Sequence, residues 1–172
     1  MKIDNLTTLL QEEIKDIYDA EKRLVRAIPK MAKATSSEAL RNALLEHLEV
    51  TRTHVERIEN IFELLNVPAK AKSCAGMRGI IAEGEETIAQ DSEATLLDTA
   101  IIGAAQRVEH YEMAAYASAR TMAEHLGKRE IAAQLQKTWG EEREADEKLA
   151  EVAEQLLADM QGRSESVHKA GE

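Results

Sequence analysis

Apolar residues recur three and four positions apart along most of the chain, which is the period of an amphipathic α-helix. No stretch shows the strict alternation of apolar and polar residues that is typical of a half-buried strand. The pattern therefore predicts helices throughout. Four are long, at about residues 6–34, 37–65, 94–126 and 129–158, and one is short, at about residues 75–89.

Residues suited to caps and turns lie between these stripes. Ser36 or Ser37 is a good N-cap for the second long helix, and Gly127 is a good residue to follow the third. Pro29 lies late in the first helix, where a proline is expected to kink a helix or end it early. The predicted helix ends are therefore supported by residue types as well as by the apolar period.

The lengths of the connections predict the topology. Short turns join the first helix to the second and the third to the fourth, so each pair is expected to form an antiparallel hairpin. Residues 66–93 are long enough to cross from one end of a bundle to the other. One long crossover in a four-helix bundle is the ferritin-like topology. We predict an all-α, ferritin-like four-helix bundle over residues 1–158, with a short fifth helix in the crossover and a polar, flexible tail over residues 159–172.

Composition narrows the class of protein. With 172 residues, 44% of them hydrophobic, the chain can bury a sizeable core. Its net charge of −10 argues against nucleic acid as a partner and is compatible with attracting cations. No apolar run reaches the ~18 residues of a membrane span, and there is no signal peptide. We expect no membrane partner and a cytoplasmic location, which the single cysteine, Cys74, also fits as an inert thiol.

Glutamates occupy positions that the stripes assign to the core. Glu21 lies in the stripe of the first helix, Glu109 and Glu112 in that of the third, and Glu142 in that of the fourth. A single such glutamate is often a boundary residue whose carboxylate reaches solvent, but four near helix midpoints are less easily explained by chance. Burying an ionised carboxylate costs several kcal/mol, so protons, basic side chains or divalent cations must compensate.

Histidines on the second helix extend this set. His47 follows the apolar stripe, although a histidine there is more commonly structural than a ligand. His54 can point beside Val55 rather than inward, and Asp146, one turn after Glu142, is either a ligand or a surface acid. Carboxylates with imidazole suit iron or manganese, and also zinc. The candidate metal ligands are Glu21, His47, Glu109, Glu112 and Glu142, with His54 and Asp146 as further candidates.

Four segments together resemble the YciE/YciF family of bacterial ferritin-like stress proteins. They are YDAEKRL at residues 18–24, EHLEVTRTHVERI at 46–58, AQRVEHYEMAAY at 105–116 and EEREADEKL at 141–149. The resemblance extends from about Leu6 to Leu157. It implies a bundle that dimerises, is expressed in stress, and has a dinuclear metal site similar to that of rubrerythrin. On that analogy the ligands are Glu21, Glu109, Glu112 and Glu142.

The second helix departs from the family pattern. Val50 stands where members tend to have Glu, and His54 where they tend to have Gln. A ferritin-type site also uses Glu-x-x-His on two of its helices, but Thr51 is three residues before His54 and Ala145 is three after Glu142. A dinuclear site, a mononuclear site, and a site in which both histidines substitute for missing ligands all remain open.

Two functions compete at this stage. The first is a redox metalloprotein whose iron or manganese reacts with peroxide or oxygen. The second is a non-catalytic metal-binding protein or helical scaffold in the stress response, so the sequence leaves open whether the chain is an enzyme. A DNA-protecting cage is disfavoured by the net charge of −10. We expect a homodimer, whose interface could be formed by the short helix and by outer apolar residues such as Ile101, Val108 and Met113.

Overall fold

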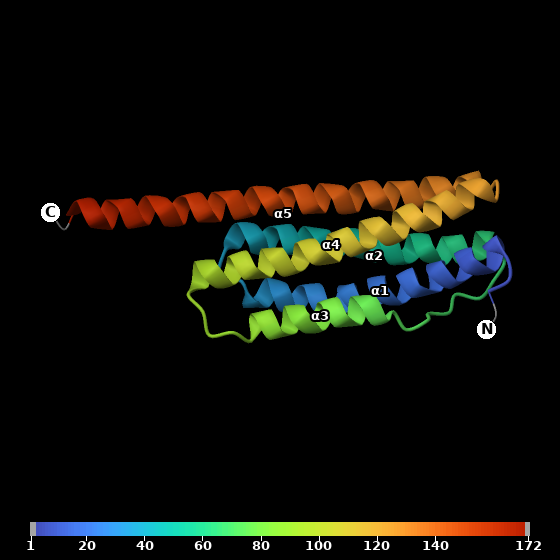
Figure 1. The fold of residues 1–172 in the computed structure, drawn as a ribbon, viewed down its shortest axis with the longest axis horizontal. Coiled ribbons are helices and arrows are strands. Elements are labelled where there is room, and N and C mark those ends of the chain that lie inside the picture. Colours follow the sequence, from blue (N-terminus) through green and yellow to red (C-terminus); the bar gives the residue numbers. More distant parts are fainter. Residues whose placement is uncertain (1–2, 171–172) are drawn as a thin grey trace.

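The computed structural model describes residues 3–170, with side chains up to Gly162. All regular structure in this part of the chain is helical, as predicted, and the long helices form a ferritin-like bundle (Figure 1). The helices are α1 (Leu6–Ala34), α2 (Glu38–Leu64), α3 (Ala75–Ile88), α4 (Ala94–His125) and α5 (Arg129–Ala170). None of the described helices is long and apolar enough to cross a membrane.

The connections follow the predicted topology. Short turns join α1 to α2 and α4 to α5, and the crossover between α2 and α4 runs from one end of the bundle to the other (Figure 1). It includes α3, which packs against α4 and α1. The long crossover allows α2 and α4 to begin at the same end, which leaves the four long helices free to face a common core.

Side chains and backbone conformation define the helix ends. The Asn5 side chain accepts a hydrogen bond from the Thr8 amide at 2.8 Å and the Ser37 side chain accepts one from the Leu40 amide at 3.2 Å. Gly127 adopts a φ of 69°, the left-handed conformation that favours glycine after a helix. α1 continues past Pro29 to Ala34, as its predicted bounds indicated, so Pro29 does not end it early.

The C-terminal helix is longer than the sequence indicated. We expected α5 to end near Ala158, but it continues to Ala170 and extends beyond the other helices (Figure 1). No proline follows Ala158 to stop it. The side chains after Gly162, and residues 171–172, lie outside the described residues, so the flexible tail predicted for residues 159–172 remains a prediction.

The core consists of two apolar clusters, one in each half of the bundle. One cluster includes Leu24 of α1 and Leu44 of α2, and the other includes Ile14 of α1 and Ile58 of α2. Every long helix contributes to both clusters. On α4 and α5 the buried glutamates occur between the residues of one cluster and those of the other, and on α1 Glu21 follows Ala20 close to this boundary. The apolar halves therefore enclose a polar layer near the middle of the bundle.

Two residues that we expected on the outer surface are part of the core. Ile101 is 0% exposed and Val108 is 7% exposed, in the same cluster as Met77 of α3. Because α3 packs over this side of α4, these residues offer no surface to a second copy, and that expectation is wrong. The sequence did not indicate which face of α4 the crossover helix would cover.

Candidate metal centre

The four glutamates of the apolar stripes lie inside the bundle. Glu21 of α1 and Glu142 of α5 are 0% exposed, and Glu109 and Glu112 of α4 are each 2% exposed. The i, i+3 spacing of the α4 pair places both carboxylates on the same face of that helix. Long helices from both hairpins thus direct acids into one layer, as the stripes predicted.

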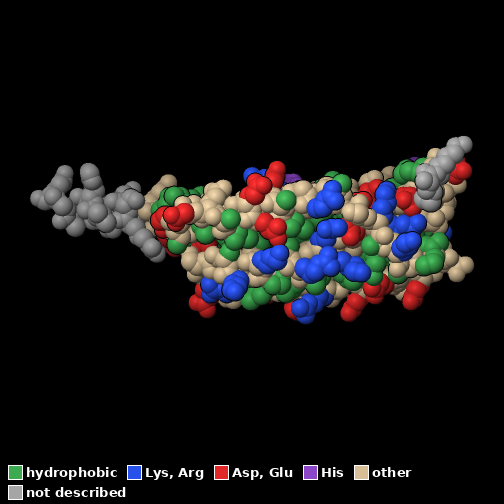
Figure 2. All heavy atoms as spheres, turned by 90° about the horizontal axis from the view of Figure 1, so that it is seen from below, with side chains coloured by type: hydrophobic (Ala, Val, Ile, Leu, Met, Phe, Trp, Pro, Cys, Tyr) green, Lys and Arg blue, Asp and Glu red, His purple; other side chains and the backbone are tan. Residues whose placement is uncertain are grey.

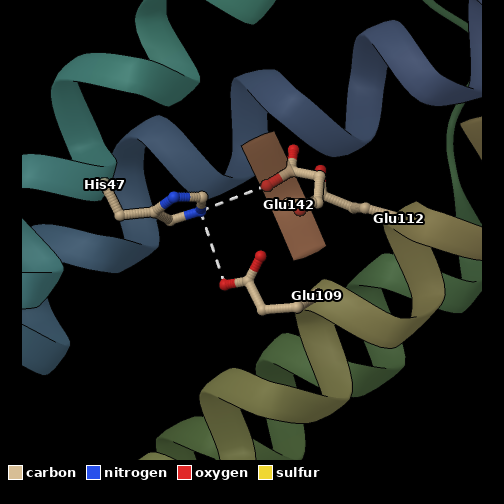
Figure 3. A group of neighbouring side chains, drawn as sticks. All are labelled: His47, Glu109, Glu112 and Glu142. Carbon is tan, nitrogen blue, oxygen red and sulfur yellow. Dashed lines mark ion pairs between the residues drawn. The ribbon is translucent and has the colours of Figure 1, made fainter. Parts of the chain in front are cut away.

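A first group of possible ligands surrounds one face of Glu142. His47, Glu109, Glu112 and Glu142 each offer a ligand atom, and these atoms all lie within 4.8 Å of one another. Figure 3 shows the His47 ring pointing between two carboxylates. Its Nε2 is 3.4 Å from Glu109 Oε1 and 3.6 Å from Glu142 Oε2. This group therefore combines one imidazole nitrogen with carboxylates from two other helices.

A second group lies on the other side of Glu142. Glu21, His54 and Glu142 also offer ligand atoms within 4.8 Å of one another. His54 Nδ1 is 2.9 Å from Glu142 Oε1 and 3.5 Å from Glu21 Oε1. Oε1 of Glu142 therefore faces His54, whereas Oε2 of Glu142 faces His47. This places Glu142 between two adjacent groups, each with one histidine.

Contacts outside these groups fix the orientation of their members. His54 Nε2 lies 3.0 Å from Glu141 Oε2, and Arg57 Nη1 donates to the same oxygen at 2.6 Å. On the other side of the layer, Tyr116 Oη donates to Glu21 Oε1. A carboxylate on the outer nitrogen of a histidine is the usual support of a metal-binding imidazole. The inner nitrogen of His54 is thereby aimed at the glutamates.

The acids of the layer have strongly perturbed pKa values. Burial, reinforced by the neighbouring carboxylates, raises the pKa of Glu109 and Glu112 well above the ordinary value. Burial alone would lower the pKa of His54, but its contacts with Glu141, Glu142 and Glu21 raise it to about 12. Without a metal, the surroundings therefore favour the neutral form of the two glutamates of α4 and the protonated form of His54.

Most of the buried polar atoms that lack a hydrogen-bond partner belong to the six residues of the two groups. Among the described side chains, the only other such atom is Nε of Arg120. Both oxygens of Glu112 and both of Glu142 lack a hydrogen bond, as do His47 Nε2 and His54 Nδ1, and what Glu142 has instead is its ion pairs with the two histidines. Leaving buried donors and acceptors unpaired is costly. Carboxylate oxygens and imidazole nitrogens pointing together are a donor set that fits iron, manganese or zinc.

The other candidate residues have different surroundings. Asp146 lies outside both groups: it accepts a hydrogen bond from Gln106 Nε2 at 2.9 Å and is 3.3 Å from His110 Nε2. His54 is fully buried in the layer rather than beside Val55. Thr51 supplies no ligand atom, because its hydroxyl donates to the backbone carbonyl of His47 at 2.8 Å. Both histidines of α2 therefore belong to the two groups of possible ligands.

Nothing in the sequence indicated that Glu141 would contact His54. Glu141 is off the apolar stripe, partly exposed, and adjacent to a residue that is on it. Arg57 and Thr138 meet at 2.5 Å from two different helices. The position of Glu141 does not follow the apolar period, and α5 contains many other glutamates. Its contact with His54 is therefore visible only once α2 is packed against α5.

Known proteins place the chain in a family. The family described as a domain of unknown function, DUF892, matches residues 5–161. The chain belongs to this family. YciF of Escherichia coli strain K12 is 43% identical over 141 residues, which are 81% of this chain and 85% of YciF. The resemblance to YciE/YciF proteins is therefore confirmed.

Solved structures agree with the DUF892 assignment. The crystal structure of the E. coli stress protein YciF matches with a TM-score of 0.88 at 39% identity, covering 91% of this chain and 99% of that one. YcfI from Rhodopseudomonas palustris matches with a TM-score of 0.85 at 36% identity, covering 87% and 95%. A Xanthomonas campestris protein at 21% identity and a TM-score of 0.71, covering 94% and 99%, shares the fold. The bundle is thus the architecture of the DUF892 family.

Proposed function

We propose that this protein is a stress-response metalloprotein that binds two divalent ions, iron or manganese, in its core and acts on peroxide or oxygen. Two groups of possible ligands share Glu142. Among the described side chains, they contain all but one of the buried polar atoms that lack a hydrogen bond, and this observation carries the proposal. Two divalent ions would neutralise the four buried glutamates, which otherwise repel one another.

The geometry suggests how the ligands divide. His47, Glu109 and Glu112 would hold one ion, and Glu21 and His54 the other, with Glu142 between them. We leave Asp146 out of the ligand set because its carboxylate lies against Gln106 and His110 instead. In this arrangement His47 and His54 take over from the ligands that are missing at positions 51 and 145.

The chain's own residues would position and shield the centre. A pair of redox-active ions would supply the electron transfer to peroxide or oxygen. Glu141 orients His54 from outside, and Tyr116 holds one oxygen of Glu21. The two apolar clusters keep bulk water from the layer on both sides. The protein would thus contribute a fixed, largely dry ligand set.

The relatives support the biological part of the proposal. YciF is described as a stress protein, and we propose the same setting for this chain, in the cytoplasm and without a nucleic-acid or membrane partner. We also propose a homodimer. Large apolar side chains that remain exposed, such as Leu45 at 43% and Leu96 at 52%, are available for it. Sedimentation equilibrium of the purified chain would measure the stoichiometry, and a monomer at all concentrations would contradict the dimer.

The metal assignment is tested by changing the two glutamates of α4. We expect the wild-type chain to hold about two ions after loading with ferrous or manganous ion, because each ligand group can hold one. The double variant Glu109→Gln, Glu112→Gln should lose metal binding and keep its helical fold, since glutamine is similar in shape but is a poor ligand. Elemental analysis and circular dichroism provide the two measurements.

A matched control uses the same spacing on an exposed helix. Glu83 and Glu86 are three residues apart on α3 and both are exposed, so changing them to Gln should leave the metal content unchanged. Undiminished metal in the Glu109, Glu112 double variant would overturn the ligand assignment. Metal bound by the wild type without turnover of peroxide or oxygen would instead assign the chain to non-catalytic metal-binding proteins.

A further inference from the structure

A pocket of about 210 Å³ lies between α2 and α5 and reaches the proposed metal centre. His47 and Glu109 form part of its wall, and both have an unpaired buried atom, Nε2 and Oε2 respectively. The His47 side chain is 10% exposed, whereas those of Glu109 and Glu142 are 3% and 0% exposed. The pocket is thus a route by which a molecule from solvent can approach the ligand groups.

The space exists because two positions have small apolar side chains. Ala145 stands where a Glu-x-x-His pattern starting at Glu142 would place a histidine, and Val50 is a small apolar residue on α2. Both residues line the pocket, together with Leu44 and Leu149. The departures from the ferritin-type pattern therefore create an apolar recess directly beside the layer of ligands.

Charges around the pocket select against anions. Glu46, Glu141 and Glu144 line it, and the only basic residue among its lining residues is Lys148. Lys148 is itself engaged, since its Nζ donates to Glu46 Oε2 across the gap between α5 and α2. The net charge of these side chains is negative, so an anionic ligand would be repelled.

We propose that this pocket binds a small neutral organic molecule that ends in a hydroxyl or hydroperoxyl group. The polar end would lie beside the side chains of His47 and Glu109, and the apolar body against Val50, Ala145 and Leu149. A volume of about 210 Å³ is several times the ~30 Å³ that one water occupies in the liquid. An organic hydroperoxide fits this size and lining better than hydrogen peroxide does. Its role as a substrate rests on the proposed function, but its binding does not.

The test uses the metal-free full chain and a stable probe, benzyl alcohol, which has the polar end and the apolar body but does not react. Binding is followed through the imidazole resonance of His47 in NMR spectra, assigned by its loss in His47→Gln. We expect a saturable shift. Ala145→Leu, which fills the recess, should weaken binding by at least about tenfold. Benzoate, of similar size but anionic, should also bind about tenfold more weakly than the alcohol.

Ala133→Leu is the matched control, because Ala133 lies on α5 but is exposed and does not line the pocket. It should leave the dissociation constant unchanged. If circular dichroism shows that Ala145→Leu does not fold, Val50→Phe fills the recess from α2 instead. Equal affinity of the filled variant and the wild type, or equal affinity for benzoate and the alcohol, would overturn the proposal. Because no metal is present, the result is independent of whether the chain binds iron or manganese.

Discussion

The buried glutamates of the polar layer differ in how their surroundings shift their pKa values when no metal is bound. Burial alone would raise the pKa of Glu142, but its contact with His54 outweighs burial and lowers it. The pKa of Glu112 is instead raised well above its usual range, by burial and then by Glu21, Glu142 and Glu109. At the scale of residues, the layer is therefore one ion pair surrounded by carboxyls that resist ionisation.

This difference predicts how stability depends on pH. The folded-state pKa of Glu112 lies above its unfolded value of 4.5, so its stabilising contribution is complete below about pH 4.5 and is lost as the pH rises toward the raised pKa. The free energy of unfolding of the metal-free protein should fall as the pH rises above about 4.5, by at most ~1.4 kcal/mol per pH unit for each such group. Urea unfolding at a series of pH values measures it.

Glu112→Gln should make this pH dependence shallower, because an amide cannot ionise. Glu63→Gln, at an exposed position on α2, serves as the control and should leave the slope as it is in the wild type. A metal-free wild type whose stability rises steadily over this range would show that Glu112 is already ionised in the folded chain.

At the scale of elements, the docking of α3 depends on one glycine. Gly76 is in the first turn of α3, and a Cβ at this position would lie 2.6 Å from Tyr111 Cε2 and 2.8 Å from Tyr111 Oη on α4. The hydroxyl of Tyr111 is also 3.1 Å from the Sγ of Cys74, the buried N-cap of α3. A side chain at position 76 would therefore push the start of α3 away from the tyrosine ring.

Gly76→Ala should accordingly destabilise the fold by about 1–3 kcal/mol, which is typical of overpacking. Gly79 is in the same helix, and a Cβ at that position would have no neighbouring atom within 4 Å. Gly79→Ala should therefore stabilise the chain by about 0.5–1 kcal/mol through helix propensity alone. Urea unfolding of both variants compares them, and equal effects of the same sign would contradict the close packing of Tyr111 on α3.

At the scale of the whole molecule, the polar layer lies between two apolar halves. Each half has its own cluster of buried residues, so the bundle has a core on either side of the unpaired acids. An ion that binds the layer only in the folded state stabilises that state by mass action. Folding and metal binding are thus expected to be coupled in this bundle.

Manganous ion should therefore raise the free energy of unfolding, by about 2.7 kcal/mol for each site at a free concentration of about 100 times its dissociation constant. The double variant Glu109→Gln, Glu112→Gln should show no such gain, since it lacks ligands of the first group. Thermal unfolding with and without the ion measures the effect. An equal gain in both proteins would place the stabilising ion elsewhere on the molecule.

The distribution of charged side chains over the surface also depends on how the helices pack. Figure 2 shows Lys and Arg gathered on the face formed by α1 and α3, although the net charge is −10. A hollow of about 270 Å³ on this side is lined by Arg23, Arg26, Lys30 and Arg78, with Glu85 as its acidic member. Net charge describes the chain, but the bundle brings basic residues from two helices to one surface.

The helices, the topology and the buried positions of the glutamates follow from patterns that are local in the sequence. Helical period and cap residues are local properties, so Ser37 and Gly127 identified turns that the structure confirms. The polar positions of Glu21 and Glu142 in otherwise apolar stripes were visible for the same reason, since a residue's place on a helix face follows from its spacing along the chain.

How these residues contact one another depends on the packing of the helices. Whether His54 points inward or beside Val55 depends on the rotation of α2 about its axis, and this rotation is fixed by packing against α1 and α5. The pairing of Glu141 with His54, and the space beside Ala145, likewise require two helices to be placed together. Spacing within a helix is set by local geometry, but contacts between helices depend on side chains far apart in the sequence.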